Sequence, residues 1–165
     1  MKSFISVDPG LSGTGYAVWT NNRKPMYTGI VVPNKSIPKS SLTTLPPRGQ
    51  SLYNQLYAIW GAMTINKVNA RITVVEWPEF FQTSGGRVSA ERGDLIKLTM
   101  AASIVCCVAW DCEHTVKMVP PRVWKGQLPK KLVITRIKRM IKGANYNSHE
   151  WDAVGLGLHH LGKEI

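Results

Sequence analysis

The fold of this chain is decided by residues 4–15, which read Phe4-Ile5-Ser6-Val7-Asp8-Pro9-Gly10-Leu11-Ser12-Gly13-Thr14-Gly15. The apolar run before Asp8 predicts a buried strand that ends at this carboxylate. A carboxylate in such a position is costly unless it is paired or holds a metal ion. The glycines that follow lack the Gly-Lys-Ser/Thr ending of a Walker phosphate loop. We therefore interpret them as a tight hairpin turn that leaves open space beside Asp8 for a phosphate.

Two later segments carry acidic side chains in similar positions. Glu76 ends a second apolar run, and His149 and Asp152 open the last helical stretch. Positions three residues apart share one helix face, so His149 and Asp152 are expected to point the same way. Glu150 lies on another face, where we expect it to be exposed or to contact a site residue. If the helix starts one residue differently, Glu150 replaces His149 in the site. These segments together predict one acidic site.

The order of the remaining elements predicts a single α/β domain over residues 1–165. The first third reads as a three-stranded antiparallel meander, followed by a mobile connection at 33–50 and by helices that alternate with strands. The expected strands are Lys2–Val7, Tyr16–Thr20, Met26–Val32, Ile72–Val75 and Thr115–Val119. The expected helices are marked by Leu52, Leu56, Ile59 and Met63; by Leu95, Leu98, Ala102, Val105 and Ala109, a mostly buried helix; by Val133, Ile137 and Met140; and by His149–Leu161.

Composition and the start of the chain indicate a cytoplasmic protein. The chain has 165 residues, of which 44% are hydrophobic, and no apolar run approaches the roughly 20 residues of a membrane span. The first residues reach a charge at Lys2 and Asp8, too soon for a signal peptide. Three clustered cysteines without a C-x-x-C spacing favour thiols over disulfides, and we expect Cys106 and Cys107 to be buried.

The charge of the chain indicates a polyanionic partner. It contains 21 Lys and Arg against 10 Asp and Glu, a net charge of +11. A solvated helix face normally mixes charges of both signs, but residues 122–142 contain no acidic residue. Nucleic acid is therefore the expected partner. The basic residues of this run are Arg122, Lys125, Lys130, Lys131, Arg136, Lys138, Arg139 and Lys142.

Four motifs in order resemble those of the RuvC-type Holliday-junction resolvases, members of the RNase H-like superfamily. They are Val7-Asp8-Pro9-Gly10, Val75-Glu76, Pro121-Arg122-Val123-Trp124-Lys125 and His149-x-x-Asp152-Ala153. The resemblance covers nearly the whole chain and implies an α/β, RNase H-like fold with a mixed five-stranded sheet and helices on both faces. It also implies a homodimer that binds a four-way DNA junction and nicks two strands symmetrically. The compact size and the insertion at 33–50 look more like phage-encoded relatives, acting in a bacterial host cell, than the housekeeping enzyme.

The resemblance also implies roles for individual residues. Asp8, Glu76 and Asp152 match the family's carboxylates, and His149 stands where many members have an aspartate and some a histidine. These four would hold two Mg²⁺ or Mn²⁺ ions, which suit hard oxygen ligands. Lys125 matches a family lysine near the cut phosphate and is the expected catalytic lysine, and either Lys130 or Lys131 matches a second. Arg122, Lys125, Lys130 and Lys131 are the residues expected to bind DNA. Contact with phosphate alone is the alternative for the lysines.

Three further points remain open at the level of sequence. Phe80 and Phe81 are expected either to touch the junction centre or to pack in the core. The helix Asp94–Trp110 is too apolar for one buried face and is the expected dimer interface. Another RNase H-like nuclease that cuts RNA–DNA hybrids or flaps, or a non-catalytic junction-binding module, are the alternative functions.

Overall fold

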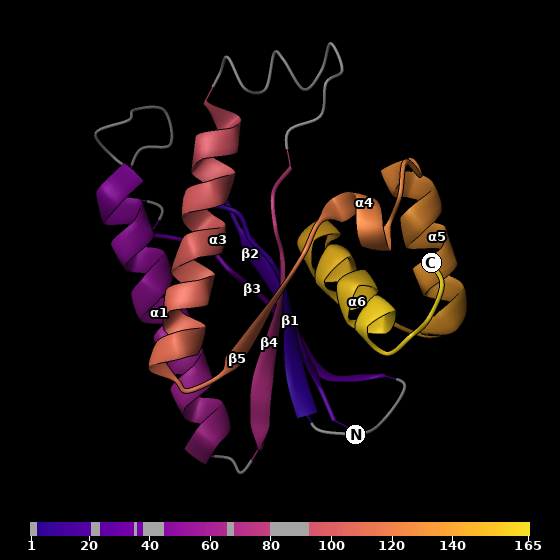
Figure 1. Cartoon of the computed structure of the whole chain (residues 1–165), viewed down its shortest axis with the longest axis horizontal. Helices are drawn as coiled ribbons and strands as arrows, with labels where there is room; N and C mark the ends of the chain where they lie inside the picture. Colours follow the sequence, from indigo (N-terminus) through magenta and orange to yellow (C-terminus); the bar gives the residue numbers. More distant parts are fainter. Residues whose placement is uncertain (1–2, 21–23, 35, 38–44, 66–67, 80–92) are drawn as a thin grey trace.

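A five-stranded mixed sheet forms the centre of the protein in the computed structural model, which describes residues 3–20, 24–34, 36–37, 45–65, 68–79 and 93–165 (Figure 1). The strand order is β3-β2-β1-β4-β5. β1 pairs antiparallel with β2 and parallel with β4, so the first strand is central. This confirms the predicted meander and the mixed sheet. The strands are β1 Ser3–Asp8, β2 Thr14–Trp19, β3 Pro25–Val31, β4 Ala70–Glu76 and β5 Thr115–Val119.

Helices cover both faces of the sheet, as predicted. Figure 1 shows α1 and α3 on one side of the strands and α4, α5 and α6 on the other. The bounds are α1 Leu45–Ile65, α3 Asp94–Asp111, α4 Pro121–Trp124, α5 Lys130–Met140 and α6 Ser148–His160. None of the helices in the described ranges is long and apolar enough to cross a membrane.

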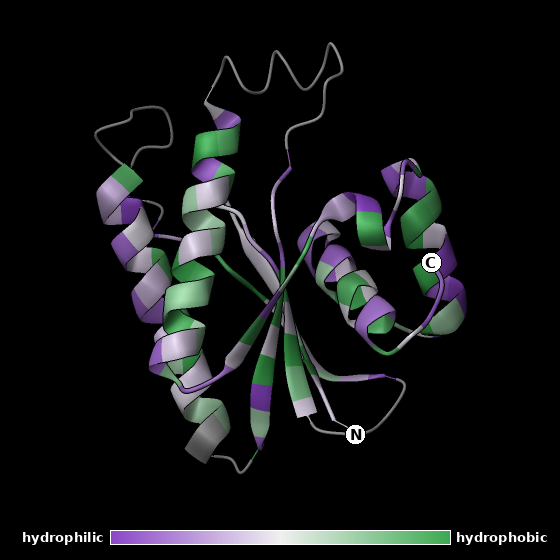
Figure 2. Cartoon of the chain, viewed as in Figure 1, coloured by the Kyte–Doolittle hydropathy of each residue, from purple (hydrophilic) through white to green (hydrophobic). Residues whose placement is uncertain are grey.

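The core consists of two apolar layers separated by the sheet. Successive side chains of a strand point to opposite faces. Ile5 and Val7 of β1 accordingly join the layer under α1 and α3, whereas Phe4 joins the layer under α4, α5 and α6. Figure 2 shows the resulting concentration of hydrophobic residues along the central strands. Burial on both faces explains why β1 reads as a continuous apolar run.

The structure corrects several local predictions. The connection expected at 33–50 is too long, because α1 already begins at Leu45. Pro46 and Pro47 made this segment read as a loop. Proline is nevertheless tolerated in the first helical turn, where backbone N–H groups have no helical partner. Cys107 is exposed, while Cys106 is buried as predicted. Leu98 and Met140 are each 42% exposed, so the core-facing stripes of α3 and α5 are narrower than their apolar patterns suggested.

Candidate active site

The two strand-end carboxylates meet because β1 and β4 are parallel neighbours. Val7 is in register with Val75, which places Asp8 and Glu76 at the same edge of the sheet. The first turn of α6 lies against β2 at this edge. A Cβ atom on Gly15 would overlap the backbone carbonyl of His149, so only glycine permits this approach. The sequence thus brings α6 close enough for its side chains to reach Asp8.

A capping box sets the start of α6. The Asn147 side chain accepts hydrogen bonds from the backbone N–H groups of His149, at 2.9 Å, and Glu150, at 3.0 Å. Glu150 Oε2 accepts from the Asn147 N–H at 3.0 Å, which completes the reciprocal pair. Its other oxygen, Oε1, accepts from Thr28 Oγ1 at 2.8 Å. Both oxygens of Glu150 are therefore engaged outside the site, and it is His149 that contacts Asp8.

Each of the three carboxylates has a basic partner. The His149 Nδ1–H donates to Asp8 Oδ2 at 2.8 Å, and Lys130 Nζ lies 2.6 Å from Asp152 Oδ2. Lys125 Nζ donates to both oxygens of Glu76, at 3.1 and 3.0 Å. These carboxylates are mostly buried, since the Asp8 and Glu76 side chains are each 14% exposed and that of Asp152 is 7% exposed.

Burial dominates the electrostatics of the site. Desolvation raises the pKa of Asp8 above its usual value, opposed by the hydrogen bond from His149, and the nearby charge of Asp152 raises it further. Desolvation likewise raises the pKa of Glu76, opposed by Lys125. The hydrogen bond to Asp8 raises the pKa of His149. The negative charges of the carboxylates thus repel one another in a poorly solvated region. Added positive charge would stabilise their ionised forms.

The donor set fits divalent metal ions by its chemistry. Asp8, Glu76 and Asp152 offer hard oxygen ligands of the kind that Mg²⁺ and Mn²⁺ prefer, and His149 offers a nitrogen. Within the described part of the chain, no three acidic, histidine or cysteine side chains already lie close enough to enclose an ion. In this structure the carboxylate oxygens of the site are instead in contact with Lys125, Lys130 and His149.

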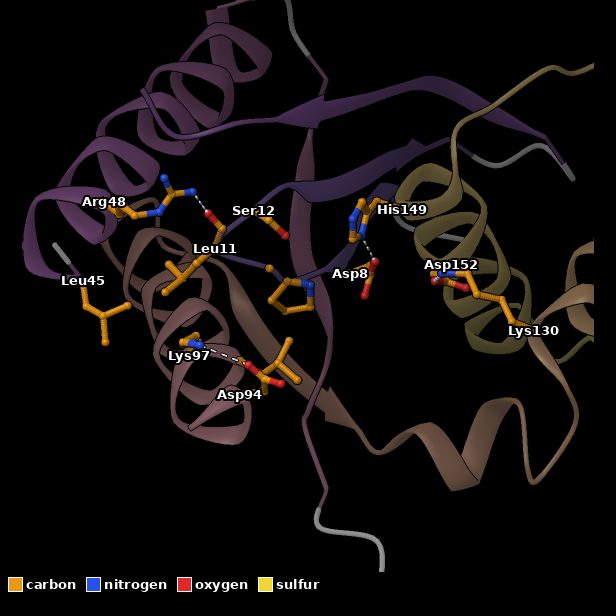
Figure 3. A pocket seen from close by; sticks show the side chains of 13 residues that line it. Asp8, Leu11, Ser12, Leu45, Arg48, Asp94, Lys97, Lys130, His149 and Asp152 are labelled. Atoms are coloured by element: carbon orange, nitrogen blue, oxygen red, sulfur yellow. Dashed lines mark hydrogen bonds and ion pairs between the residues drawn. The ribbon is translucent and has the colours of Figure 1, made fainter. Parts of the chain in front are cut away.

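A groove of about 530 Å³ opens beside these residues (Figure 3). Asp8, His149, Asp152 and Lys130 lie at one end, and the turn between β1 and β2 forms its middle. Thr14 Oγ1 closes that turn by donating to the Gly10 carbonyl at 2.9 Å and accepting from the Gly10 N–H at 3.1 Å. The predicted open space beside Asp8 is therefore present.

The residues predicted to contact DNA are placed unequally. Arg122 is 72% exposed at its side chain and pairs with Glu79, Nε to Oε1, at 2.9 Å. Lys131 is exposed on α5, next to Lys130. Phe80 and Phe81 lie outside the described residues.

Two contacts of the site were not predicted. Trp124 Nε1 donates to Glu76 Oε2 at 2.9 Å, so Glu76 is held both by the last residue of α4 and by Lys125, which follows it. The motif Pro121–Lys125 already contained this tryptophan, and its position next to Lys125 was the available signal. The pairing of Lys130 with Asp152 joins α5 to α6 across 22 positions, and no local pattern predicts it.

The fold is that of known RuvC structures. T. thermophilus RuvC in complex with a Holliday junction substrate matches with a TM-score of 0.69 and 17% identity, over 96% of this chain and 92% of that one. Another Thermus thermophilus RuvC structure matches with a TM-score of 0.66 and 17% identity, over 96% and 93%. No family model and no curated protein matches the sequence. The structural likeness confirms the RNase H-like fold that the four motifs predicted.

Proposed function

We propose that this protein is a metal-dependent, structure-selective endodeoxyribonuclease that resolves four-way DNA junctions by paired symmetric nicks. The observation that carries the proposal is the meeting of Asp8, Glu76 and Asp152 at one edge of the sheet, poorly solvated and each beside a basic side chain. A fold shared with a RuvC protein bound to a Holliday junction supports the choice of substrate. The whole chain, residues 1–165, would form one nuclease domain.

The side chains of the site divide the work of phosphodiester hydrolysis. Two bound divalent ions supply a nucleophilic water and neutralise the charge that develops on the phosphate. Asp8 would have the central place among the ligands, because it ends β1, which lies between β4 with Glu76 and β2, against which the first turn of α6 packs. His149 would offer a ring nitrogen and would have to be neutral to do so, since only neutral imidazole binds a metal; its Nδ1 now contacts Asp8.

The basic residues of the site have two roles in this proposal. Lys125 and Lys130 neutralise Glu76 and Asp152 before the ions arrive. Once released, their ammonium groups are free to contact DNA phosphates near the cut. Arg122 and Lys131, both exposed, would add to this positive surface. Because these contacts are made with the backbone, they provide affinity and position without reading sequence.

A homodimer follows from the symmetry of the substrate. Paired nicks on a two-fold junction require two sites related by a two-fold axis. The exposed apolar side chains of α3 support this helix as the interface, with Ile96 63% and Trp110 58% exposed. Light scattering at micromolar concentration, with and without junction, should give the mass of two chains. A monomeric mass under both conditions would exclude the dimer.

The decisive experiment uses Asp8→Asn on a synthetic mobile four-way junction with Mg²⁺ or Mn²⁺. We expect no nicking but nearly unchanged junction affinity in a gel shift, because Asp8 holds the ions while the basic side chains hold the DNA. Asp111→Asn is the matched control, since Asp111 lies at the far end of α3 and bonds Tyr53 Oη at 2.6 Å. Equal loss of nicking and binding in Asp8→Asn would contradict the assignment.

The same assay separates the junction resolvase from its alternatives. A panel of four-way junction, flap, RNA–DNA hybrid and linear duplex is incubated with the wild-type protein under both metals. The proposal requires the fastest nicking on the junction, at symmetric positions in opposite strands. Faster cutting of the hybrid or the flap would identify another RNase H-like nuclease. Junction binding without any cutting would identify a non-catalytic module.

A further inference from the structure

The groove continues well past the acidic residues. Its far end is lined by the first turns of α1 and α3, with Leu45 and Arg48 from α1 and Asp94, Lys97 and Leu98 from α3. Figure 3 shows Leu45, Arg48, Asp94 and Lys97 across the β1–β2 turn from the acidic end of the groove. The phosphodiester chemistry described above uses none of them. The far end therefore offers room and side chains for another part of a substrate.

Arg48 is an unusual wall for a groove. It is 3% exposed, and its guanidinium donates to two backbone carbonyls, those of Ile37, at 3.0 Å, and Leu11. Among the described residues, no carboxylate forms an ion pair or a hydrogen bond with it. Because its guanidinium has no counter-charge among these residues, Arg48 makes the far end of the groove positive. A buried charge in this state is costly. An anion placed there would compensate this charge.

Two other features at the far end also favour an anion. Lys97 lies on the groove, with Nζ 3.1 Å from Asp94 Oδ1, and is 37% exposed at its side chain. The N-terminal turns of α1 and α3 both border the groove. The N-terminal end of a helix carries a partial positive charge. Asp94 opposes these effects and would compete with an incoming anion for Lys97.

Apolar side chains at the same end indicate that the ligand is more than a free phosphate. Leu11 and Leu45 are buried, and Leu98 is 42% exposed, on the wall of the groove. A volume of about 530 Å³ exceeds what one phosphate at the acidic end requires. Positive charge beside an apolar wall matches a nucleotide, in which a phosphate is joined to a sugar and a flat base.

We propose that the far end of the groove is a subsite for a nucleotide close to the cleaved bond. Its phosphate lies against Arg48 and Lys97, and its sugar or base lies against Leu11, Leu45 and Leu98. The inference rests on the proposed function, because it assumes that the cut phosphate occupies the acidic end. It adds a direction to it, since the strand then runs from α6 across the β1–β2 turn toward α1 and α3.

A neutral-phosphate scan tests the subsite. Junctions are made with one methylphosphonate at each phosphate within about three nucleotides of the crossover, and affinity and nicking rate are measured. At one position, wild-type protein should lose at least about tenfold in affinity, the size of a charge-assisted contact. Lys97→Met should lose clearly less affinity than the wild type on the same substitution, because one of the two partners of that phosphate is already gone while Arg48 remains. Lys97→Arg should restore the wild-type loss.

A matched control and a second readout keep the outcomes distinct. Lys117→Met removes an exposed lysine of the edge strand β5, outside this groove, and should retain the full wild-type loss. If the methylphosphonate lowers affinity as much in Lys97→Met as in the wild type at every position, the two changes are independent and the subsite is overturned. Absence of nicking by the wild type on unmodified junctions would instead overturn the proposed function, while the coupling in affinity still decides the subsite.

Discussion

Replacing Gly157 by alanine should destabilise the protein, although alanine is the better helix former. Gly157 lies in α6, and an added Cβ would overlap the indole ring of Trp19. Trp19 has little room to yield, because it is fully buried and stacks on Phe4 with ring centroids 5.6 Å apart. Gly61, in α1, is the matched control: a Cβ there meets no atom within 4 Å.

The expected magnitudes follow from two opposing effects. An alanine in a helix interior gains about 1 kcal/mol over glycine. Forcing a methyl group into a packed core costs about 1–3 kcal/mol. Because the indole ring of Trp19 is rigid, we expect the cost at Gly157 to be near the upper end of this range. Gly157→Ala should therefore lower the free energy of unfolding by about 1–2 kcal/mol, whereas Gly61→Ala should raise it by about 1 kcal/mol.

Urea unfolding followed by far-ultraviolet circular dichroism measures both changes without relying on the fluorescence of Trp19. The cleavage rate of Gly157→Ala should also fall while the protein is still folded, because α6 carries His149 and Asp152. A shift of the same sign in the two variants would refute the reasoning, as would a Gly157→Ala protein at least as stable as the wild type.

Four further outcomes are expected. Because Mn²⁺ accepts imidazole more readily than Mg²⁺ does, wild-type nicking should favour Mn²⁺, and His149→Asp should move the preference toward Mg²⁺; an unchanged preference would reject His149 as a ligand. With limiting metal, nicking should rise with pH around a midpoint above the usual 6.5, because the hydrogen bond to Asp8 raises the pKa of His149; an acid-side midpoint below 6.5 would show that bound metal displaces the proton first. Lys131→Gln should reduce the salt dependence of junction affinity by about 0.9 in log–log slope, and an unchanged slope would place the DNA elsewhere. Burial lowers the pKa of His114 below its unfolded value of 6.5, so stability should fall as pH drops below 6.5, and less so in His114→Gln, as measured by urea unfolding at several pH values.

The central part of the fold and the meeting of the acidic residues followed from local patterns. A strand buried on both faces reads as a continuous apolar run, and the apolar run before Asp8 predicted the buried strand that β1 forms. Asp8 and Glu76 each end such a run, and a strand end is where parallel neighbours bring side chains together. The interval between His149 and Asp152 gave their common helix face. Each of these inferences needed only the residue pattern within a single strand or helix.

The remaining features depend on tertiary contacts between distant segments, which the residue pattern of a single strand or helix does not predict. Lys130 appeared as one cation in a basic run, and only the packing of α5 on α6 directs it to Asp152. Arg48 lies after two prolines in a segment with the composition of a loop, so neither its helix nor its burial was expected. The contact between His149 and Asp8, which raises the pKa of His149, also joins two distant segments and so could not be expected from the sequence near either residue.

The position of α6 in the chain has a consequence during synthesis. Every strand of the sheet precedes this helix, and Asp8 is made 144 positions before Asp152. A nascent chain that has already formed β1 and β4 still lacks the side chains that α6 brings. If the proposed activity is correct, ribosome-bound fragments that stop before residue 148 can bind polyanions through their basic residues without cutting DNA. The acidic site would in that case be completed only once the last helix has been made.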